Sequence, residues 1–246
     1  MMVIPAVDLK NGRCVRLRQG RLDAETVYSD DPVAMARHWV DQGAQWLHVV
    51  DLDGAIDGEP QNLPVIEHIV KQVSVPMQVG GGIRTITRVE RYLGLGVARV
   101  IIGTLAVEQP ALSAEICQRF PGRVAVSLDA RDGKVAVQGW RESAARDYLD
   151  VARQIEAWHP AVLIFTAIQR DGTLQGPDLP RLKALLAAVE TPVIVAGGIG
   201  RLEHLQELLP FGPHGLQGII IGKALYDRSV AFREALLLAQ REMNAC

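Results

Sequence analysis

Eight short apolar runs alternate with longer amphipathic stretches from one end of the chain to the other. The runs are continuous rather than alternately polar and apolar, which is typical of parallel strands buried on both faces. We predict strands at residues 2–8, 46–51, 75–79, 99–102, 123–128, 161–165, 192–195 and 218–221. The periodicity between them predicts helices at residues 32–43, 62–72, 85–95, 108–119, 144–158, 178–188, 201–209 and 229–243. Eight such units without a Gly/Ser-rich linker predict an α/β fold, a single (β/α)8 TIM barrel over residues 1–246.

The second half of the chain repeats phrases of the first. Residues 75–84 read VPMQVGGGIR and residues 191–200 read TPVIVAGGIG. A further pair follows, IIGT at 101–104 and IIGK at 220–223. This repetition predicts two half-barrels, approximately residues 1–120 and 121–246, and favours closure over the alternative, an open doubly wound sheet. It also predicts a symmetric site for a substrate with two similar ends.

Composition and charge exclude several classes of partner. Hydrophobic residues make up 48% of the chain and the formal net charge is −2, which argues against bulk attraction to nucleic acid or an anionic membrane. No apolar run reaches the ~18 residues of a membrane span, and the start, MMVIPAVDLK, has no basic leader. The three cysteines, Cys14, Cys117 and Cys246, form no metal or disulfide pattern. We therefore expect a cytoplasmic protein without a metal site.

Local patterns predict how some elements begin and connect. Asp31-Pro32 indicates a helix N-cap followed by proline in the first turn, and Asn62 and Asp178 are further caps. Asn11-Gly12 lies between two possible short strands and predicts a small hairpin in the first loop. The segment GKALY after the eighth strand predicts a short extra helix.

Polar residues that end predicted strands are the first candidates for catalysis, because a barrel places its active site at the carboxyl ends of its strands. Asp8 ends the first strand and Asp129 the fifth, so we expect them to face each other across the barrel mouth. Asp51 and Thr166 end the second and sixth strands and form another opposed pair. One such aspartate is as often a cap, but two opposed carboxylates suit general acid–base catalysis. They also suit a hard cation, although the sequence places no third carboxylate with them.

Glycine-rich turns follow four predicted strands and indicate phosphate binding. Glycine lets the backbone approach a ligand, and N–H groups at the start of a following helix bind anions. Barrels recurrently hold a phosphate after strands seven and eight, and the repetition predicts a second phosphate after strands three and four. Arg84 and Lys223 are candidates to add positive charge, with an exposed surface role as the alternative. The candidates are Gly81, Gly82, Arg84, Gly103 and Thr104 at one site and Gly197, Gly198, Gly222 and Lys223 at the other.

Two loop motifs are weaker candidates. Trp140 lies in the polar loop 130–143, where it either stacks on a planar base or packs on the barrel rim. Gly172, in Arg170-Asp171-Gly172 after the sixth strand, marks a tight turn or a phosphate-binding loop. The absence of a nucleophile elbow, P-loop and dinucleotide fingerprint counts against covalent catalysis and a nicotinamide cofactor. The histidines have no metal spacing and are interpreted as structural: His38, His48, His68, His159, His204 and His214.

The blocks IPAVDLKNGRCVRLRQG, HVVDLDGA, VGGGIR, SLDARDGKVAVQGW, RDGTLQG and AGGIG occur in this order along essentially the whole chain. In them the chain resembles the phosphoribosyl isomerases of histidine biosynthesis, the phosphoribosylformimino-aminoimidazole-carboxamide ribotide (ProFAR) isomerases. The resemblance implies an Amadori rearrangement of an aminoaldose to an aminoketose, on a substrate with a phosphate at each end. It implies Asp8 as general base, Asp129 as general acid and Thr166 as a supporting residue. We expect no cofactor, because the protonated imine of the opened sugar is the electron sink, and a monomer without an obligate protein partner.

The chain departs from the family pattern at two positions. The family usually has an acidic residue after the strand-six threonine, where this chain has Ala167. It often has serine before the second glycine pair, where this chain has Ala196. The first departure affects how Thr166 is held, and the second removes a possible hydroxyl contact to phosphate.

Three other functions remain open. The cyclase subunit of imidazole-glycerol-phosphate synthase shares the half-barrel repeat and both aspartates but works with a glutaminase partner. Against it, the first strand reads Ile4-Pro5-Ala6-Val7-Asp8 where the cyclases have proline-cysteine-leucine-aspartate. A dual-substrate isomerase that also acts on phosphoribosylanthranilate fits the same residues. A phosphate-sugar binding module leaves both strand-end aspartates unexplained.

Overall fold

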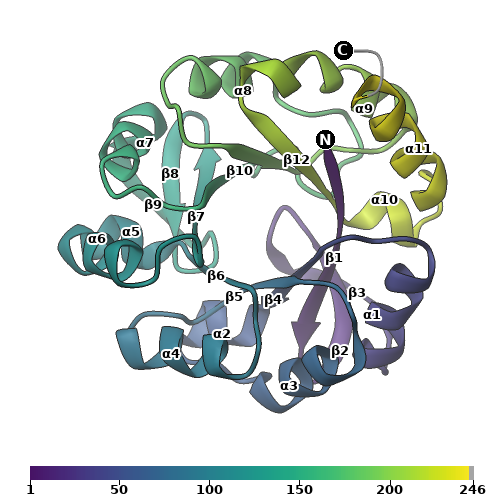
Figure 1. Ribbon diagram of the computed structural model, residues 1–246, viewed down its shortest axis with the longest axis horizontal. Coiled ribbons are helices and arrows are strands. Elements are labelled where there is room, and N and C mark those ends of the chain that lie inside the picture. The colour runs from purple at the N-terminus through teal and green to yellow at the C-terminus, as the bar shows by residue number, and fades with distance from the viewer. Residues whose placement is uncertain (244–246) are drawn as a thin grey trace.

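The computed structural model describes residues 1–243, where a closed barrel of parallel strands is surrounded by helices (Figure 1). Within this range the sheet closes because β1 pairs with β12 and β7 pairs with β10. Each predicted strand overlaps one barrel strand, so the (β/α)8 prediction is confirmed and the open sheet is wrong. Cys246 lies outside the described residues. The barrel strands are β1 (Met2–Lys10), β4 (Leu47–Asp51), β5 (Met77–Gly80), β6 (Arg99–Ile102), β7 (Val124–Arg131), β10 (Val162–Ala167), β11 (Val193–Ala196) and β12 (Leu216–Ile221).

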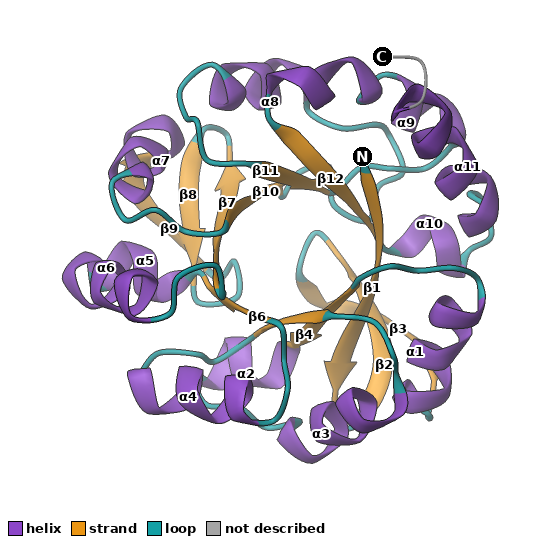
Figure 2. Cartoon of the chain, viewed as in Figure 1, coloured by secondary structure: helices purple, strands orange, loops and turns teal. Residues whose placement is uncertain are grey.

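Helices form a ring outside the barrel (Figure 2). None in the described part of the chain has both the length and the apolar character needed to cross a bilayer. The ring consists of α1 (Pro32–Asp41), α3 (Leu63–Gln72), α4 (Ile86–Gly94), α6 (Pro110–Arg119), α7 (Tyr148–Glu156), α8 (Leu179–Leu186), α9 (Leu202–Gln206) and α11 (Phe232–Met243). Shorter helices follow three barrel strands: α2 (Leu52–Asp57), α5 (Thr104–Glu108) and α10 (Lys223–Tyr226). Helix α10 confirms the extra helix predicted after the eighth strand.

Three helix predictions need correction. The helix predicted at 144–158 begins at Tyr148, because residues 144–147 belong to a strand. The helix predicted at 201–209 ends at Gln206, and the 3-10 helix η1 (Leu209–His214), which contains two prolines, follows it. The last helix begins at Phe232 rather than 229. These differences lie at element ends, where local periodicity is weakest.

The predicted caps are partly confirmed. Asp31 accepts a hydrogen bond from Ala34 N at 2.9 Å, and Asp178 accepts one from Arg181 N at 3.2 Å. Asn62 stands at the N-cap position of α3, but its side chain makes no capping hydrogen bond. The prediction that Asn62 caps this helix is therefore wrong, because its amide is used elsewhere, in contacts described below.

An antiparallel hairpin grows from the first barrel strand. Strand β2 (Arg13–Arg18) folds back on β1 through Asn11-Gly12, as predicted, and β3 (Arg21–Ser29) adds to β2. The two turn residues have φ of 49° and 73°, the left-handed region that a two-residue hairpin loop of this kind requires.

A second hairpin grows from the fifth barrel strand, at the corresponding point of the other half. Strand β8 (Lys134–Val137) folds back on β7 through Asp132-Gly133, with φ of 50° and 79°, and β9 (Glu142–Asp147) adds to β8. The sequence reasoning missed this hairpin, although Asp-Gly is the same turn signal as Asn-Gly. The half-chain repeat thus includes a strand-plus-hairpin unit.

Much of the barrel interior is filled by a cluster of apolar side chains. The interior cluster consists of Ile4, Ala6, Ile101, Ala125, Val162, Ile164, Ile194 and Ile220.

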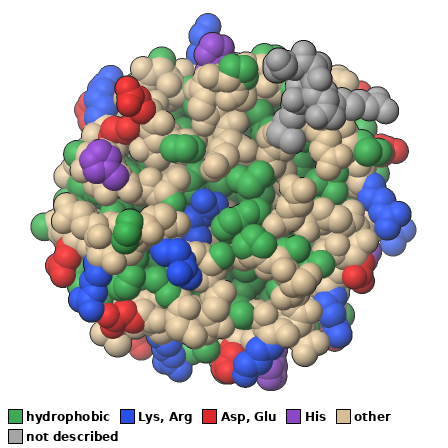
Figure 3. Space-filling view, viewed as in Figure 1, with side chains coloured by type: hydrophobic (Ala, Val, Ile, Leu, Met, Phe, Trp, Pro, Cys, Tyr) green, Lys and Arg blue, Asp and Glu red, His purple; other side chains and the backbone are tan. Residues whose placement is uncertain are grey.

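On the face shown in Figure 3, side chains of lysine or arginine and of aspartate or glutamate are interspersed around the rim. This mixture agrees with the small net charge of the chain.

Candidate active site at the carboxyl ends of the strands

A cavity of about 250 Å³ lies at the carboxyl ends of the barrel strands. Side chains and backbone from strands of both halves line it, together with the two hairpins and the loop after β10. All the site residues proposed from the sequence except Asp51 lie on its wall: Asp8, Gly81, Gly82, Arg84, Gly103, Thr104, Asp129, Trp140, Thr166, Gly172, Gly197, Gly198, Gly222 and Lys223. The fold therefore brings these residues together, and their individual roles remain predictions.

Asp8, at the end of β1, is paired with an arginine that sequence reasoning missed. Arg16 Nη1 donates to Asp8 Oδ2 at 2.6 Å, and the two side chains are only 10% and 16% exposed. Burial raises the pKa of Asp8, and the neighbouring guanidinium opposes that shift. Burial alone would lower the pKa of Arg16, but the Asp8 carboxylate raises it, so this arginine stays charged. The available signal was the Asn11-Gly12 turn, which folds β2 back beside the end of β1.

Asp129, at the end of β7, has neutral neighbours instead. Ser127 Oγ donates to Asp129 Oδ2 at 2.8 Å, and the buried Thr166 is the Cα neighbour of Asp129 on β10. Burial raises the pKa of Asp129, while hydrogen bonds from Thr166, Trp140 and Ser127 act in the opposite direction. Sequence reasoning missed Ser127, which shares a face with Asp129 because side chains two residues apart along a strand point the same way.

Asp51 does not line the cavity and does not partner Thr166 across it. It is fully buried and N-caps α2 through a hydrogen bond from Gly54 N at 2.9 Å. It also accepts from Gln61 N at 2.7 Å, Asn62 N at 2.8 Å and Asn62 Nδ2 at 2.7 Å. A carboxylate with four donors is a structural hub, so the prediction of a second functional pair is wrong.

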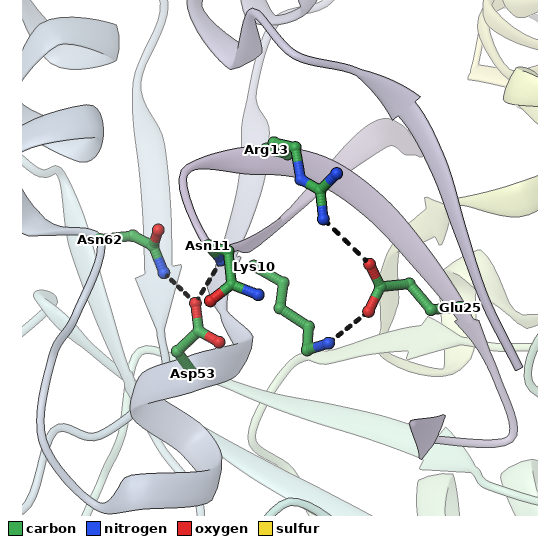
Figure 4. Close-up of polar contacts among 6 residues, drawn as sticks. All are labelled: Lys10, Asn11, Arg13, Glu25, Asp53 and Asn62. Carbon is green, nitrogen blue, oxygen red and sulfur yellow. Dashed lines mark hydrogen bonds and ion pairs between the residues drawn. The ribbon is translucent and has the colours of Figure 1, made fainter. Parts of the chain in front are cut away.

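Figure 4 shows the polar contacts that fix the first hairpin at its Asn11-Gly12 turn, between β1 and β2, and at β3. Asp53 accepts hydrogen bonds from Asn11 N at 2.6 Å and from Asn62 Nδ2 at 2.9 Å. On the other side, Glu25 of β3 pairs with Lys10 and, at 3.8 Å, with Arg13. The strand that carries Arg16 is thus held at its turn and across its sheet.

The two glycine clusters lie in matching positions of the two halves. Gly82 and its counterpart Gly198 have φ of 70° and 84°, and a Cβ would lie 2.8 Å from Gly54 O at the first and 2.2 Å from Gly176 O at the second. Only glycine fits either position, because both the backbone conformation and the adjacent carbonyl exclude a side chain. Helices α5 and α10 begin beside these turns, directly after Gly103 and Gly222.

The charged residues near the clusters differ between the halves. The guanidinium of Arg84 lies against Gly58, so that a Cβ at Gly58 would be 2.7 Å from Arg84 Nη1. In the second half, Lys223 Nζ lies 3.7 Å from an Asp227 carboxylate oxygen. A Cβ at Gly222 would lie 2.7 Å from the guanidinium of Arg16, so the same arginine faces Asp8 and the second cluster.

Three loops meet above the cavity. The tip of the first hairpin contacts the loop after β10, because Gln19 N donates to Asp171 O at 3.2 Å and Gln19 Nε2 to Gln169 O at 2.9 Å. Trp140, at the tip of the second hairpin, lies so close to Gly20 that a Cβ there would be 2.5 Å from its ring. These contacts place Trp140 on the cavity wall beneath the first hairpin; stacking on a planar base stays a prediction.

Two further residues on the cavity wall correct the sequence analysis. Asp171 is a third carboxylate near Asp8 and Asp129, where none was expected. Burial and the negative charges of these two aspartates raise the pKa of Asp171 to about 7, against the influence of Arg16. His48 also lines the cavity, which the purely structural interpretation of the histidines did not anticipate. No group of three or more His, Cys, Asp or Glu side chains within residues 1–243 has a metal-binding arrangement.

Comparison with known proteins places the chain among enzymes of one biosynthetic route. The family described as "Histidine biosynthesis protein" matches residues 2–231. A protein of Geobacter sp. (strain M21) is 48% identical over 242 residues, covering 98% of this chain and 100% of the relative. One of Gloeothece citriformis (strain PCC 7424) is 50% identical over 236 residues, covering 96% and 92%. Both relatives are named 1-(5-phosphoribosyl)-5-((5-phosphoribosylamino)methylideneamino) imidazole-4-carboxamide isomerase. With a barrel whose cavity gathers two strand-end aspartates and two glycine clusters, this chain belongs to the histidine biosynthesis protein family.

Proposed function

We propose that the protein is the aldose–ketose isomerase of histidine biosynthesis that its relatives are named for. It converts the bisphosphorylated aminoaldose, 1-(5-phosphoribosyl)-5-((5-phosphoribosylamino)methylideneamino) imidazole-4-carboxamide, to its aminoketose by an Amadori rearrangement. The observation that carries the proposal is the pair Asp8 and Asp129, which end opposite barrel strands in one cavity and have different electrostatic neighbours.

The reaction needs one proton donated and another removed. Asp129 protonates the ring oxygen of the aminoribose, the C1–O bond breaks, and the nitrogen lone pair forms a protonated Schiff base at C1. Asp8 then removes the proton from C2, and the C2–H electron pair forms the enolamine. Loss of the C2 hydroxyl proton and protonation at C1 give the ketose. The imine is the electron sink, so the chemistry requires no metal or redox cofactor; unchanged turnover after treatment with a chelator is expected.

The environments of the two aspartates support this division of roles. Burial raises both pKa values, but only Asp8 has an arginine against its carboxylate. A fixed positive charge favours the ionised form, which a base requires. The neighbours of Asp129 are neutral hydrogen-bond donors, so burial acts there without a compensating charge and favours the protonated acid.

The two glycine clusters are proposed to hold the two phosphates. Gly81, Gly82, Gly103 and Thr104 form one cradle, and Gly197, Gly198, Gly222 and Lys223 the other, with backbone N–H groups as the donors. Arg84 adds charge to the first, whereas Lys223 and Arg16 add charge to the second. Trp140 covers the planar imidazole, and Gly172 lets the loop after β10 pass close to the first hairpin. Binding of both phosphates holds the reacting carbon of the substrate between the two aspartates, where positioning contributes most to rate.

The test is conversion of the aminoaldose by the purified protein alone. We expect turnover by wild type, and a loss of about 10²–10⁴-fold in kcat for Asp8→Asn and for Asp129→Asn. Asp150→Asn, on the exposed side of α7, is the matched control and should keep full activity. Full activity of either site variant contradicts the acid–base roles. Turnover of only the ketose, in the presence of ammonia, identifies a cyclase instead, and conversion of phosphoribosylanthranilate identifies a dual-substrate enzyme.

We also propose that the protein acts in the cytoplasm as a monomer without an obligate partner, and that it binds neither nucleic acid nor a membrane. The two cysteines of the described residues, Cys14 and Cys117, are both free and buried, which agrees with a reducing compartment. Both aspartates and both glycine clusters of the proposed site lie on the wall of one cavity within this chain. Sedimentation at assay concentrations is expected to give the mass of a single chain, and a stable complex needed for turnover contradicts the proposal.

A further inference from the structure

A row of polar side chains crosses the interior of the barrel below Asp8. His48 on β4, Gln78 on β5 and Arg99 on β6 are Cα neighbours in successive strand pairs. Gln78 Nε2 lies 2.9 Å from His48 Nδ1, and Gln78 Oε1 accepts from Arg99 Nε at 3.1 Å and from Arg99 Nη2 at 2.6 Å. The three residues therefore form a continuous chain of hydrogen bonds.

This row of hydrogen bonds has only one consistent arrangement of protons. Arginine has donors and no acceptor, so the oxygen of the Gln78 amide must face Arg99. The NH2 group of Gln78 then faces His48, and Nδ1 of the ring must accept its hydrogen bond. A neutral imidazole whose Nδ1 is an acceptor carries its proton on Nε2. The arginine thus determines, through an amide, which nitrogen of a distant histidine is a donor.

The surroundings keep this arrangement in place. Gln78 is fully buried and Arg99 is 6% exposed, with its guanidinium stacked 4.7 Å from the ring of Trp46. Within the described residues Arg99 forms no salt bridge with an acidic side chain. Its guanidinium donates instead to the amide oxygen of Gln78. Burial and the charges of Arg16 and Arg99 lower the pKa of His48 to about 3, which keeps the ring neutral at physiological pH.

The free side of His48 lies at the substrate cavity. His48 is the Cα neighbour of Ala6 and lies one inward-facing layer below Asp8, which neighbours Val50. Both Ala6 and His48 line the cavity wall. Within residues 1–243 the ring makes no protein hydrogen bond other than that to Gln78. The Nε2–H group is therefore a donor without a protein acceptor beside the proposed catalytic base.

We propose that His48 is a fixed, neutral hydrogen-bond donor to a sugar oxygen of the substrate, and that Gln78 and Arg99 are positioning residues that set its tautomer. The proposal rests on the isomerase function proposed above and extends it to the oxygen next to the reacting carbon. As C2 changes from an alcohol carbon to a carbonyl carbon, a donor at its oxygen stabilises the charge that develops there. A neutral donor does so without placing a second cation beside Asp8, whose basicity it would reduce.

The first test measures the tautomer directly and needs no substrate. Long-range proton–nitrogen correlation spectra of ¹⁵N-histidine-labelled protein, with His48→Phe used to assign its signal, distinguish a ring protonated at Nε2 from one protonated at Nδ1. We expect neutral His48 protonated at Nε2 in wild type near neutral pH. A ring protonated at Nδ1, or at both nitrogens, overturns the proposal. This result is independent of whether the enzyme converts the aminoaldose.

The second test replaces the donor that Gln78 presents to His48 with an acceptor. Gln78→Glu keeps the size and the Arg99 contact but presents an acceptor to His48, so Nδ1 must become protonated. We expect kcat to fall about 10²-fold with a much smaller change in KM, as for loss of a donor aimed at developing charge. Gln72→Glu, exposed at the end of α3, is the control and should match wild type. An unchanged kcat in Gln78→Glu, with the altered tautomer seen in the spectra, overturns the proposal.

A double-variant cycle separates positioning from general damage. If Gln78 acts through His48, then Gln78→Glu should cost little further kcat in a His48→Phe background, whereas independent structural damage would multiply. Multiplicative losses, or full kcat in His48→Phe alone, overturn the proposal. If Gln78→Glu does not fold, the wild-type spectra and the kinetics of His48→Phe still decide. Failure of wild type to turn over the aminoaldose instead removes the proposed function, a separate outcome.

Discussion

Asp171 offers a demanding test of the electrostatics of this site. Its pKa rises from 3.8 to about 7 because of burial and the charges of Asp8 and Asp129, even though Arg16 acts in the opposite direction. The folded state therefore holds a proton on this carboxyl at pH values where the unfolded chain has released it. Its contribution to stability is fully present below the unfolded pKa and is lost as the pH rises through the folded value.

Asp171→Asn removes this titration with little change in side-chain size, and the hydrogen bond from Gln19 N to the backbone oxygen remains available. Each unit of pKa difference is worth about 1.4 kcal/mol, so wild type should lose about 3 kcal/mol of unfolding free energy through this group between about pH 5 and about pH 8. The variant should lack this loss and should therefore be relatively more stable at the higher pH.

The assay is urea unfolding at several pH values across that range, with Asp150→Asn as an exposed control that should follow wild type. Asp8 and Asp129 also have raised pKa values, so some decline with pH will persist in the variant. The decisive quantity is the difference between the two curves. If unfolding free energy falls with pH equally in wild type and Asp171→Asn, the reasoning about this carboxyl is refuted.

Three further predictions follow from the cavity wall and its supports. Arg16→Met should move the acid limb of the pH profile of kcat/KM to higher pH, because the proposed base, Asp8, loses the cation that favours its ionised form; an unmoved limb contradicts the proposed role. Gly20→Ala should raise KM, because the new Cβ would lie 2.5 Å from the Trp140 ring and displace the side chain proposed to cover the imidazole. Gly122→Ala is the control: Gly122 has a similar φ of 74° but nothing near its Cβ position, so KM should not change. Asp51→Asn should lower the free energy of unfolding by roughly 2–5 kcal/mol, measured in urea, because buried donors lose their charged acceptor; a change below about 0.5 kcal/mol would count against the hub.

Much of the scaffold could be predicted because its determinants are local. Continuous apolar runs identify buried parallel strands wherever they occur, and the repeated glycine turns place Gly81 and Gly198 in equivalent loops. The strand-end positions of Asp8 and Asp129 follow from run boundaries alone, since the barrel itself brings strand ends together.

What escaped prediction depends on contacts that cross long sequence distances. Residues 144–147 have helical periodicity but are recruited into β9 by pairing with β8. Asp51 looks like Asp8 in sequence, yet the turn before α3 brings backbone donors around it. Asp171 and His48 reach the cavity only because a loop folds over it and a strand faces inward. The second hairpin is the exception, because Asp132-Gly133 is a local turn signal of the same kind as Asn11-Gly12.

The paired hairpins bear on how a duplicated protein acquires direction. In the first hairpin the strand-register partner of Lys10 is Arg13, and in the second the register partner of Arg131 is Lys134. Arg13 therefore corresponds to Lys134. Three residues further along each hairpin, Arg16 corresponds to Val137. Both side chains line the cavity, but one carries a charge and the other is a buried aliphatic group. Two identical halves would offer the substrate equal acids at both ends and bind it either way round. In the proposed mechanism this position of a repeated hairpin helps to give the barrel a polarity, because its charge favours Asp8 over Asp129 as the base.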